Sequence, residues 1–204
     1  MTTSHRPDTV YVVDDDAAVR DALALLLQAH GHPVRAFASG EAFLAALEAQ
    51  SSGCVILDVR MDGLSGLDVF DRLCQRGSEL SVLFLSGHGD IPMAVQAVKQ
   101  GAFDFLEKPC REEELLHKLD QALAQIAQRR QVRQGTAALQ ARLARLSPRE
   151  REVMQQVLAG KLNKQIADEL QITVRTVEVH RANVFTKMEV RSAVELAQLL
   201  AGLG

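Results

Sequence analysis

Carboxylate, hydroxyl and ammonium side chains follow four apolar segments of the chain, each at the point where the segment ends. These side chains belong to Asp14 and Asp15, Asp58, Ser86 and Lys108. Three carboxylates held together repel one another unless a cation lies among them. Oxygen ligands without histidine or cysteine suit Mg²⁺, which binds one or two carboxylates together with phosphate oxygens. Lys108 and Ser86 would contact a phosphoryl group, and Asp58 would act as the nucleophile towards it.

Asp58 considered alone does not require this chemistry. It ends the apolar run Cys54-Val55-Ile56-Leu57, and a carboxylate there can simply be a turn residue or a helix cap. The polar residues after the other runs have equally ordinary explanations. All four sites, however, fall at the carboxyl ends of predicted parallel strands, where α/β sheets bind their ligands. The sequence therefore predicts phosphorylation of Asp58, with a metal and a lysine offsetting charge in the transition state.

The elements that position these side chains alternate between strand and helix. Short apolar runs predict strands at Val10–Val13, Val34–Phe37, Cys54–Asp58, Val82–Leu85 and Phe103–Leu106. Helical spacing predicts helices at Ala17–Ala29, after the cap Ser39, at Leu67–Cys74, from the turn Gly87–Pro92 to Gly101, and from Arg111. Strict alternation predicts an α/β doubly wound, flavodoxin-like sheet of five parallel strands with right-handed crossovers.

A segment rich in Gln, Ala and Arg separates this predicted domain, residues 8–125, from the last part of the chain. Residues 126–145 are expected to form a helical linker that continues the last helix, with Gly135 as the candidate break. A flexible coil is the alternative, which the Ala, Gln and Leu content disfavours. The arginines between residues 129 and 133 are expected to form a solvated helix face rather than a DNA site.

Residues 146–204 predict a small all-α domain. A capping box from Ser147 to Glu150, with Pro148 between them, begins its first helix, and a tight turn separates Asn163–Leu170 from Val174–Met188. This pattern is typical of a helix-turn-helix, whose second helix enters the major groove of DNA. The inward face of that helix is expected to comprise Val177, Val184 and Met188, with Phe185 as a further candidate. A small helical bundle that binds protein remains the alternative.

Composition and charge agree with two different units. The chain has 204 residues, of which 47% are hydrophobic and 24% charged, with 13 Lys/Arg and 19 Asp/Glu in residues 1–136 (net −6) and 10 against 7 afterwards (net +3). A basic second unit fits a nucleic-acid partner. We find no transmembrane-length apolar run and no apolar core of a signal peptide. Three scattered cysteines favour a reducing cytoplasm and disfavour a structural zinc site.

The motifs of the first unit also resemble a known family. Val13-Asp14-Asp15, Leu57-Asp58, Ser86-Gly87 and Glu107-Lys108-Pro109 resemble the receiver domain of two-component response regulators, specifically the FixJ/NarL family and its FixJ type. The resemblance implies that Asp58 becomes a 4-aspartylphosphate. It implies a metal site for Mg²⁺ (or Mn²⁺) in which Asp15 binds directly, Asp14 binds through water, and the backbone carbonyl of Arg60 and Asp58 complete the protein ligands. It further implies that Ser86 and Lys108 contact the phosphoryl group and that Phe105 is the switching aromatic.

One residue departs from that family pattern. The family usually has Met-Pro after the phosphoacceptor, whereas this chain has Met61-Asp62. Proline would restrict the loop, so we expect Asp62 to leave it more mobile and to add a negative charge close to the site. Phosphoryl lifetime or metal affinity would change, whereas the chemistry itself would not.

The second unit resembles LuxR-type DNA-binding domains. The resemblance lies in Leu146-Ser147-Pro148-Arg149-Glu150, in Asn163-Lys164-Gln165-Ile166-Ala167 and in the run from Thr176 to Arg181. It implies that Glu178, Val179 and Ala182 face bases. It implies that the DNA backbone is contacted by Lys164, Thr176, His180, Arg181 and Lys187.

Together the two resemblances imply a response regulator that is not an enzyme beyond its own phosphoryl transfer and dephosphorylation. Its expected partners are a sensor histidine kinase, double-stranded promoter DNA, RNA polymerase and, after phosphorylation, a second copy of itself; no membrane is involved and the expected location is cytoplasmic. Two rivals remain. A Mg²⁺-dependent phosphohydrolase would need a second acid where Arg60 stands, and a constitutive DNA-binding protein would use its first unit only to dimerise.

Overall fold

The computed structural model describes residues 8–48, 51–87 and 91–201 of the chain. The chain divides into two units, Met1–Arg129 and Arg130–Gly204, and each is described by itself. Two predictions fall on residues outside these ranges. The predicted turn Gly87–Pro92 includes residues 88–90, and the predicted absence of a signal peptide concerns residues 1–7.

The first unit is built on one parallel sheet with strand order β2-β1-β3-β4-β5. The strands are β1 (Thr9–Val13), β2 (Val34–Phe37), β3 (Gly53–Asp58), β4 (Ser81–Ser86) and β5 (Asp104–Glu107). Both β3 and β4 are buried along their whole length, as central strands covered on both faces must be. The predicted doubly wound, flavodoxin-like fold is confirmed.

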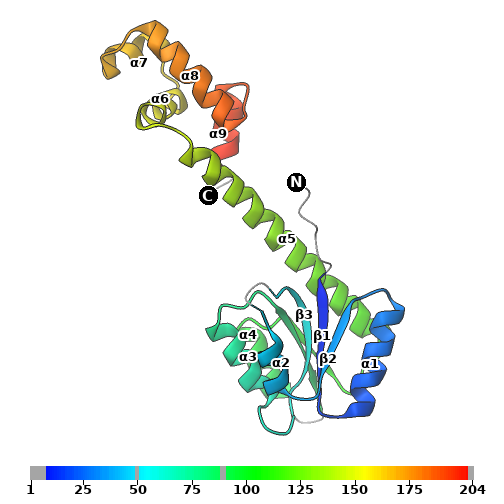
Figure 1. Cartoon of the computed structure of the whole chain (residues 1–204). Helices are drawn as coiled ribbons and strands as arrows, with labels where there is room; N and C mark the ends of the chain where they lie inside the picture. Colours follow the sequence, from blue (N-terminus) through cyan, green and yellow to red (C-terminus); the bar gives the residue numbers. More distant parts are fainter. Residues whose placement is uncertain (1–7, 49–50, 88–90, 202–204) are drawn as a thin grey trace. The chain divides into compact units, whose positions relative to one another are not determined.

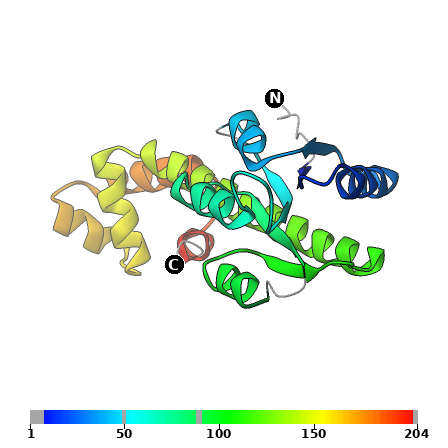
Figure 2. The same ribbon diagram turned by 90° about the horizontal axis from the view of Figure 1, so that it is seen from below.

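Helices cover the two faces of this sheet, because successive side chains of each strand point to opposite sides. Tyr11 and Val13 pack towards α2 (Gly40–Ala46), α3 (Gly66–Gln75) and α4 (Ile91–Lys99). Val10 and Val12 pack towards α1 (Ala17–Ala29) and the beginning of α5 (Glu112–Ala144). Figure 1 shows α1 on the opposite side of the sheet from α2 and α3, and the view from below in Figure 2 shows the same two layers.

Side-chain caps begin the helices close to where the sequence predicts them. Asp16 accepts from the backbone N–H groups of Ala18 and Val19 at the start of α1, and Ser39 caps α2. Ser65 and Asp68 form a reciprocal capping box that begins α3 at Gly66, one residue before its predicted start. The last strand begins at Asp104 rather than at Phe103, whose backbone N–H bonds to the Val82 carbonyl just before the ladder starts.

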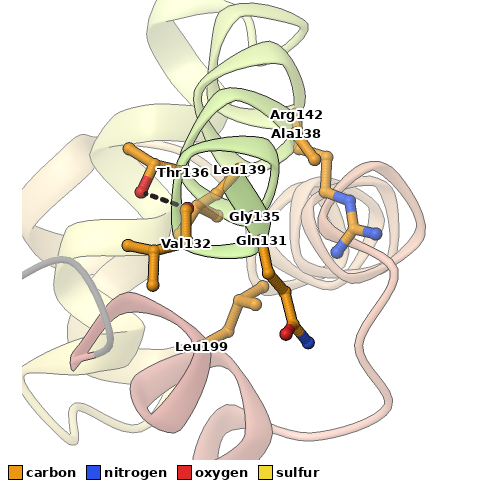
Figure 3. Close-up of a pocket in the computed structure, with 8 residues that line it drawn as sticks. All are labelled: Gln131, Val132, Gly135, Thr136, Ala138, Leu139, Arg142 and Leu199. Carbon is orange, nitrogen blue, oxygen red and sulfur yellow. Dashed lines mark hydrogen bonds between the residues drawn. The ribbon is translucent and has the colours of Figure 1, made fainter. Parts of the chain in front are cut away.

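The helix α5 runs without interruption from Glu112 to Ala144, so the candidate break at Gly135 is wrong. A single glycine costs a helix only about 1 kcal/mol relative to alanine, which the surrounding Ala, Gln and Arg residues tolerate. Within the second unit, Leu139 of this helix is buried and Leu143 packs beside it in the core. A groove of about 480 Å³ opens between this part of α5 and Leu199 (Figure 3), and the Thr136 hydroxyl donates to the Val132 carbonyl on its wall.

After α5, the described part of the second unit comprises α6 (Pro148–Leu158), α7 (Asn163–Leu170), α8 (Val174–Met188) and α9 (Ala193–Ala201). The predicted capping box between Ser147 and Glu150 begins α6, with Pro148 in its first turn. Ile166 and Ala167 of α7 meet the inward face of α8 in one core. That inward face is Val177, Val184 and Met188, as predicted, and Phe185 is half-buried against it. Among the described residues, we find no helix both long and apolar enough to cross a membrane.

Candidate functional site

The strands that lead into the predicted site residues all end at one edge of the sheet, because all the strands run in the same direction. Asp14 follows β1 directly, Asp58 is the last residue of β3, and Ser86 is the last residue of β4. Lys108 follows β5, and its backbone N–H bonds to the Ser86 carbonyl. The structure therefore brings together the polar residues that lie far apart in the sequence.

Lys108 is the cation at the centre of this edge. Its Nζ lies 2.7 Å from Oδ2 of Asp14 and 3.2 Å from Oδ1 of Asp58. Asp14 is 1% exposed and Asp58 is 7% exposed, whereas the Lys108 side chain is 27% exposed. Two carboxylates buried beside each other would be strongly unfavourable without such a partner. One ammonium group shared by two carboxylates leaves the edge with a net negative charge.

The balance of burial and charge shifts the pKa values of this pair. Burial raises the pKa of Asp58, and the Asp14 carboxylate adds to that effect, while Lys108 opposes it. Burial by itself would lower the pKa of Lys108, but its hydrogen bonds and charge interactions with Asp14 and Asp58 outweigh burial and raise it. Lys108 is thus held firmly as a cation, and the Asp58 carboxylate carries its charge at some cost. A second cation would relieve that cost.

The acidic cluster of Asp14, Asp15 and Asp58 fits a hard metal ion. One carboxylate oxygen from each residue lies within 4.8 Å of the others. Asp14 and Asp58 are buried while Asp15 is exposed, so the cluster has a route to solvent. Carboxylate ligands without nitrogen or sulfur match Mg²⁺ and Mn²⁺, and an exposed member leaves room for the waters that Mg²⁺ retains. The residues present therefore fit the predicted metal.

Neighbouring groups hold the cluster in position. The guanidinium of Arg20 donates to the backbone carbonyls of Asp14 (2.8 Å) and Asp15 (3.2 Å). The backbone N–H of Asp16 donates to Asp14 Oδ1 at 2.9 Å, and that of Asp62 donates to Asp15 Oδ2 at 3.0 Å. Sequence reasoning missed Arg20 and the Asp62 amide. The sequence does place Arg20 one turn into the predicted helix that follows Asp14 and Asp15, and this spacing indicates that the two could meet. Nothing in the sequence indicates the contact of the Asp62 amide.

The remaining predicted residues of this unit lie around the cluster. The Ser86 hydroxyl is buried and donates to the Leu106 carbonyl at 3.4 Å, a long hydrogen bond. Phe105 precedes Leu106 in β5 and is half-buried against the core beneath α2, α3 and α4. Arg60 lies in the loop after Asp58, and its backbone N–H bonds to the Asp58 carboxylate. The predicted roles of these residues stay predictions.

On α8, the residues predicted to face bases form an exposed surface. Glu178, Val179 and Ala182 are all exposed, and Val179 is 54% exposed although its side chain is apolar. The residues at the opposite side of the helix are buried. An exposed face with a carboxylate, a valine and an alanine has the side chains that can read cytosine amino and thymine methyl groups in a major groove.

The residues predicted to contact the DNA backbone differ in their exposure and in the hydrogen bonds that they already make within the domain. Lys164 is exposed, whereas Thr176 shares a hydrogen bond of 2.8 Å with Thr173. Arg181 donates to Asn163 Oδ1 at 2.8 Å, with its guanidinium 5.7 Å from the Phe185 ring centroid. His180 is half-buried, and its Nδ1 is a buried atom without a hydrogen-bond partner among the described residues.

Lys187 has a role within the domain that the sequence did not predict. Its Nζ lies 2.6 Å from Oε2 of Glu150, which is 4% exposed and also accepts from the Ser147 backbone N–H at 2.8 Å. The hydrogen bond from Lys187, followed by that from Ser147, lowers the pKa of Glu150 to about 2. This ion pair joins the first turn of α6 to the end of α8. Contact with DNA would require Lys187 to serve two partners.

We expect this pair to make the second unit sensitive to acid. A folded pKa of about 2 against an ordinary value of 4.5 means that the pair stabilises the fold above pH 4.5 and that this stability is lost as the pH falls from about 4.5 to about 2. Because solvent reaches Lys187, the contribution is about 1–2 kcal/mol rather than the full value of the shift. Glu150→Gln should lower the unfolding free energy by this amount at pH 7, measured by urea denaturation.

The matched control is Glu152→Gln, which removes the exposed carboxylate paired with Arg149 three residues away. An exposed pair of this kind contributes about 0.5 kcal/mol or less. The difference between Glu150→Gln and the parent protein should shrink as the pH falls from 4.5 towards 2. An equal effect of the two substitutions, or a difference independent of pH, would refute the stabilising role of the pair.

The chain matches two known protein families, one within the first unit and one within the second. Residues 10–120 match the response regulator receiver domain, and residues 144–200 match the bacterial regulatory proteins of the luxR family. The chain is 46% identical over 195 residues to the transcriptional regulatory protein FixJ of Bradyrhizobium diazoefficiens, covering 96% of this chain and 95% of that protein. It is 45% identical to the response regulator protein TodT of Pseudomonas putida F1, covering 96% and 86%.

Solved structures agree with these relatives. The response regulator StyR is 41% identical, with a TM-score of 0.90 and coverage of 97% of this chain and 99% of that one. Full-length FixJ from B. japonicum is 44% identical, with a TM-score of 0.62 and coverage of 97% and 98%. The similarity therefore extends over both units and is not confined to the sheet domain.

Proposed function

Because this chain is a two-component response regulator with a receiver domain and a LuxR-type DNA-binding domain, we propose that phosphorylation of Asp58 controls its binding to promoter DNA. The chain is a transcriptional regulator whose receiver domain implies a sensor kinase and whose LuxR-type domain implies DNA as partners. One observation carries the proposal for Asp58. Its carboxylate ends a central strand and lies beside both a shared lysine and two further carboxylates.

Phosphoryl transfer to Asp58 follows from this geometry. A carboxylate oxygen of Asp58 forms the new bond to phosphorus while the bond from phosphorus to the donor breaks, and the electron pair leaves with the donor. Asp14 and Asp58 keep Lys108 protonated. As negative charge moves from the Asp58 carboxylate to the phosphoryl oxygens, the Lys108 ammonium group can move its contact to those oxygens. The Ser86 hydroxyl, now on the Leu106 carbonyl, can donate to a phosphoryl oxygen instead.

The metal would be held by Asp15 directly, Asp14 through water, Asp58 and the backbone carbonyl of Arg60. When bound, Mg²⁺ or Mn²⁺ supplies the positive charge that lets a phosphoryl group approach three carboxylates. Asp14 also holds Lys108 at 2.7 Å, and Arg20 holds the carbonyls of Asp14 and Asp15. These residues thereby keep the site's charges in place before phosphate arrives.

The change at Asp58 would reach the rest of the receiver through Ser86 and β5. If Ser86 leaves the Leu106 carbonyl, the adjacent Phe105 is free to turn into the core beneath α4. The surface formed by α4 and β5 would then change shape and pair with the same surface of a second copy. We place the receiver in residues 8–125, the helical linker in 126–145 and the DNA-binding domain in 146–204.

The DNA-binding domain would insert α8 into the major groove of each half-site. Glu178, Val179 and Ala182 would meet bases, while Lys164, Thr176, His180, Arg181 and Lys187 would meet phosphates. A homodimer would occupy two half-sites about one helical turn apart. RNA polymerase would be the next partner at the promoter, which puts the protein in the cytoplasm. Its only catalytic events would be its own phosphorylation and dephosphorylation.

The test combines phosphorylation with DNA binding. The full chain is incubated with acetyl phosphate and Mg²⁺, phosphate is located by mass spectrometry, and fragments retained from genomic DNA are titrated by fluorescence anisotropy. We expect one phosphoryl group per chain and affinity for retained fragments about tenfold to a hundredfold higher than without phosphate. Equal affinity with and without phosphate would favour the constitutive DNA-binding protein. In a separate incubation with a soluble phosphoester in place of acetyl phosphate, sustained hydrolysis with many turnovers per chain would favour the phosphohydrolase.

A further inference from the structure

The loop between β3 and α3 contacts the acidic cluster through one backbone group. The N–H of Asp62 donates to Oδ2 of Asp15 at 3.0 Å, across 47 positions of sequence. Asp15 is the exposed member of the cluster, whereas Asp14 and Asp58 are buried. An exposed carboxylate is free to rotate unless a hydrogen bond restrains it. The amide of Asp62 is such a restraint, and it acts on a predicted metal ligand.

This amide is a fixed donor because its loop is anchored on both sides. Two residues later, the Leu64 backbone N–H donates to Oε1 of Glu41 on α2 at 3.0 Å. Further on, the Gly66 backbone N–H donates to the Val59 carbonyl at 3.0 Å. Between the first two contacts lies Gly63, with φ +79°, a left-handed conformation that favours glycine. The chain is therefore held where the Asp62 N–H points at the cluster.

We propose that the Asp62 backbone amide is a positioning group that prepares the Asp15 carboxylate for the metal ion. This inference rests on the proposed function, since it assigns Asp15 to the metal. A carboxylate held at one oxygen loses less freedom when its metal arrives, and outer-shell hydrogen bonds of this kind increase metal affinity. The exposed side chain of Asp62 adds only a solvent-screened charge.

Two substitutions separate the amide from the side chain. Asp62→Ala and Asp62→Pro both remove the carboxylate, but only proline also removes the N–H. Mg²⁺ affinity of the full, unphosphorylated chain is measured by isothermal titration calorimetry. Asp62→Ala should bind Mg²⁺ within about twofold of the parent, because an exposed charge is screened. Asp62→Pro should bind about fivefold to tenfold more weakly than Asp62→Ala, since it lacks a hydrogen bond to a charged acceptor.

A second pair of variants tests the same role without proline, because proline can itself distort the loop. Glu41→Ala releases the loop at Leu64 without altering the donor or the cluster, whereas Glu41→Gln keeps an acceptor oxygen there. Glu41→Ala should weaken Mg²⁺ binding about twofold to threefold, and Glu41→Gln should not. A metal-free readout is the NMR signal of the residue 62 amide, whose hydrogen exchange should accelerate in Asp15→Ala.

The outcomes distinguish this inference from the function on which it rests. Equal Mg²⁺ affinity of Asp62→Pro and Asp62→Ala, together with no effect of Glu41→Ala, would overturn the positioning role and leave the metal site intact. If Asp15→Ala bound Mg²⁺ as tightly as the parent, the assignment of Asp15 would fail, and this inference with it. A weaker Asp62→Pro and a residue 62 amide that depends on Asp15 would support it.

Discussion

Asp58→Asn is expected to take up no phosphoryl group from acetyl phosphate or from a phosphorylated kinase. The substitution keeps the size of the side chain and replaces the nucleophilic carboxylate with an amide. Lys108 retains its contact with Asp14 at 2.7 Å, so the site should remain assembled. Intact-protein mass spectrometry should show the added phosphoryl group on the parent chain and none on the variant. Phosphate-dependent DNA binding should disappear with it.

The fold should not suffer from this substitution. Burial raises the pKa of Asp58, which means that the folded state holds its ionised carboxylate less favourably than water does. A group with a raised folded pKa favours the fold below its ordinary pKa, and that contribution is lost as the pH rises through the folded pKa. At pH 7 a neutral asparagine removes this disadvantage. We expect an unfolding free energy equal to or higher than that of the parent, measured by urea denaturation.

Asp16→Asn is the matched control for Asp58→Asn. It changes a neighbouring carboxylate that caps α1, a task that asparagine performs equally well. This variant should accept phosphate as the parent does. Incorporation of phosphate into a folded Asp58→Asn chain at the same extent as the control would show that the phosphoacceptor lies elsewhere.

The sheet and the gathering of its strand ends could be predicted because they depend on local patterns. Apolar runs such as Cys54-Val55-Ile56-Leu57 identify central strands, and parallel strands must end at one edge. Caps such as Ser147 begin helices through contacts within four residues of sequence. The inward face of α8 followed from spacing in the same way.

Contacts between distant segments could not be predicted in this way. The pair of Lys187 with Glu150 spans 37 positions, and the bond from Asp62 to Asp15 spans 47. Neither residue carries a local sign of its partner, and the Asp62 contact uses a backbone N–H that nearly any residue would supply. Lys187 was therefore predicted as a DNA contact alone. Only the packed fold shows that its ammonium group is already paired.

Gly135 and Gly66 show how differently two helical glycines can behave. An added Cβ at Gly135 would have no atom within 4 Å, so this position does not require glycine and the helix passes through it. An added Cβ at Gly66 would lie 2.1 Å from the carbonyl oxygen of Asp58. Sequence alone distinguishes the two poorly, because the difference lies in what packs against them.

Gly66→Ala is accordingly expected to destabilise the receiver and to disturb the phosphorylation site. The clashing atoms belong to the backbone of Asp58 and to the Val59 Cα at 3.1 Å, so no flexible side chain can move aside. Overpacking against backbone costs about 1–3 kcal/mol or more. Relief would require the end of β3 to shift, and that shift would displace the carboxylate. We expect a loss of about 3 kcal/mol in urea denaturation and a slower uptake of phosphate.

Gly77→Ala separates this clash from the general cost of replacing a glycine. Gly77 lies in the same unit at φ +62°, and an added Cβ there has no neighbour within 4 Å. Its substitution should therefore cost only the left-handed strain, about 1–2 kcal/mol, and should leave phosphate uptake unchanged because Gly77 follows the end of α3 opposite to Gly66. If Gly66→Ala proved no more costly than Gly77→Ala and took up phosphate at the parent rate, the close approach of α3 to Asp58 would not constrain the site. The expected order, with Gly66→Ala the more costly and the only one to slow phosphorylation, would tie the start of α3 to the position of the phosphoacceptor.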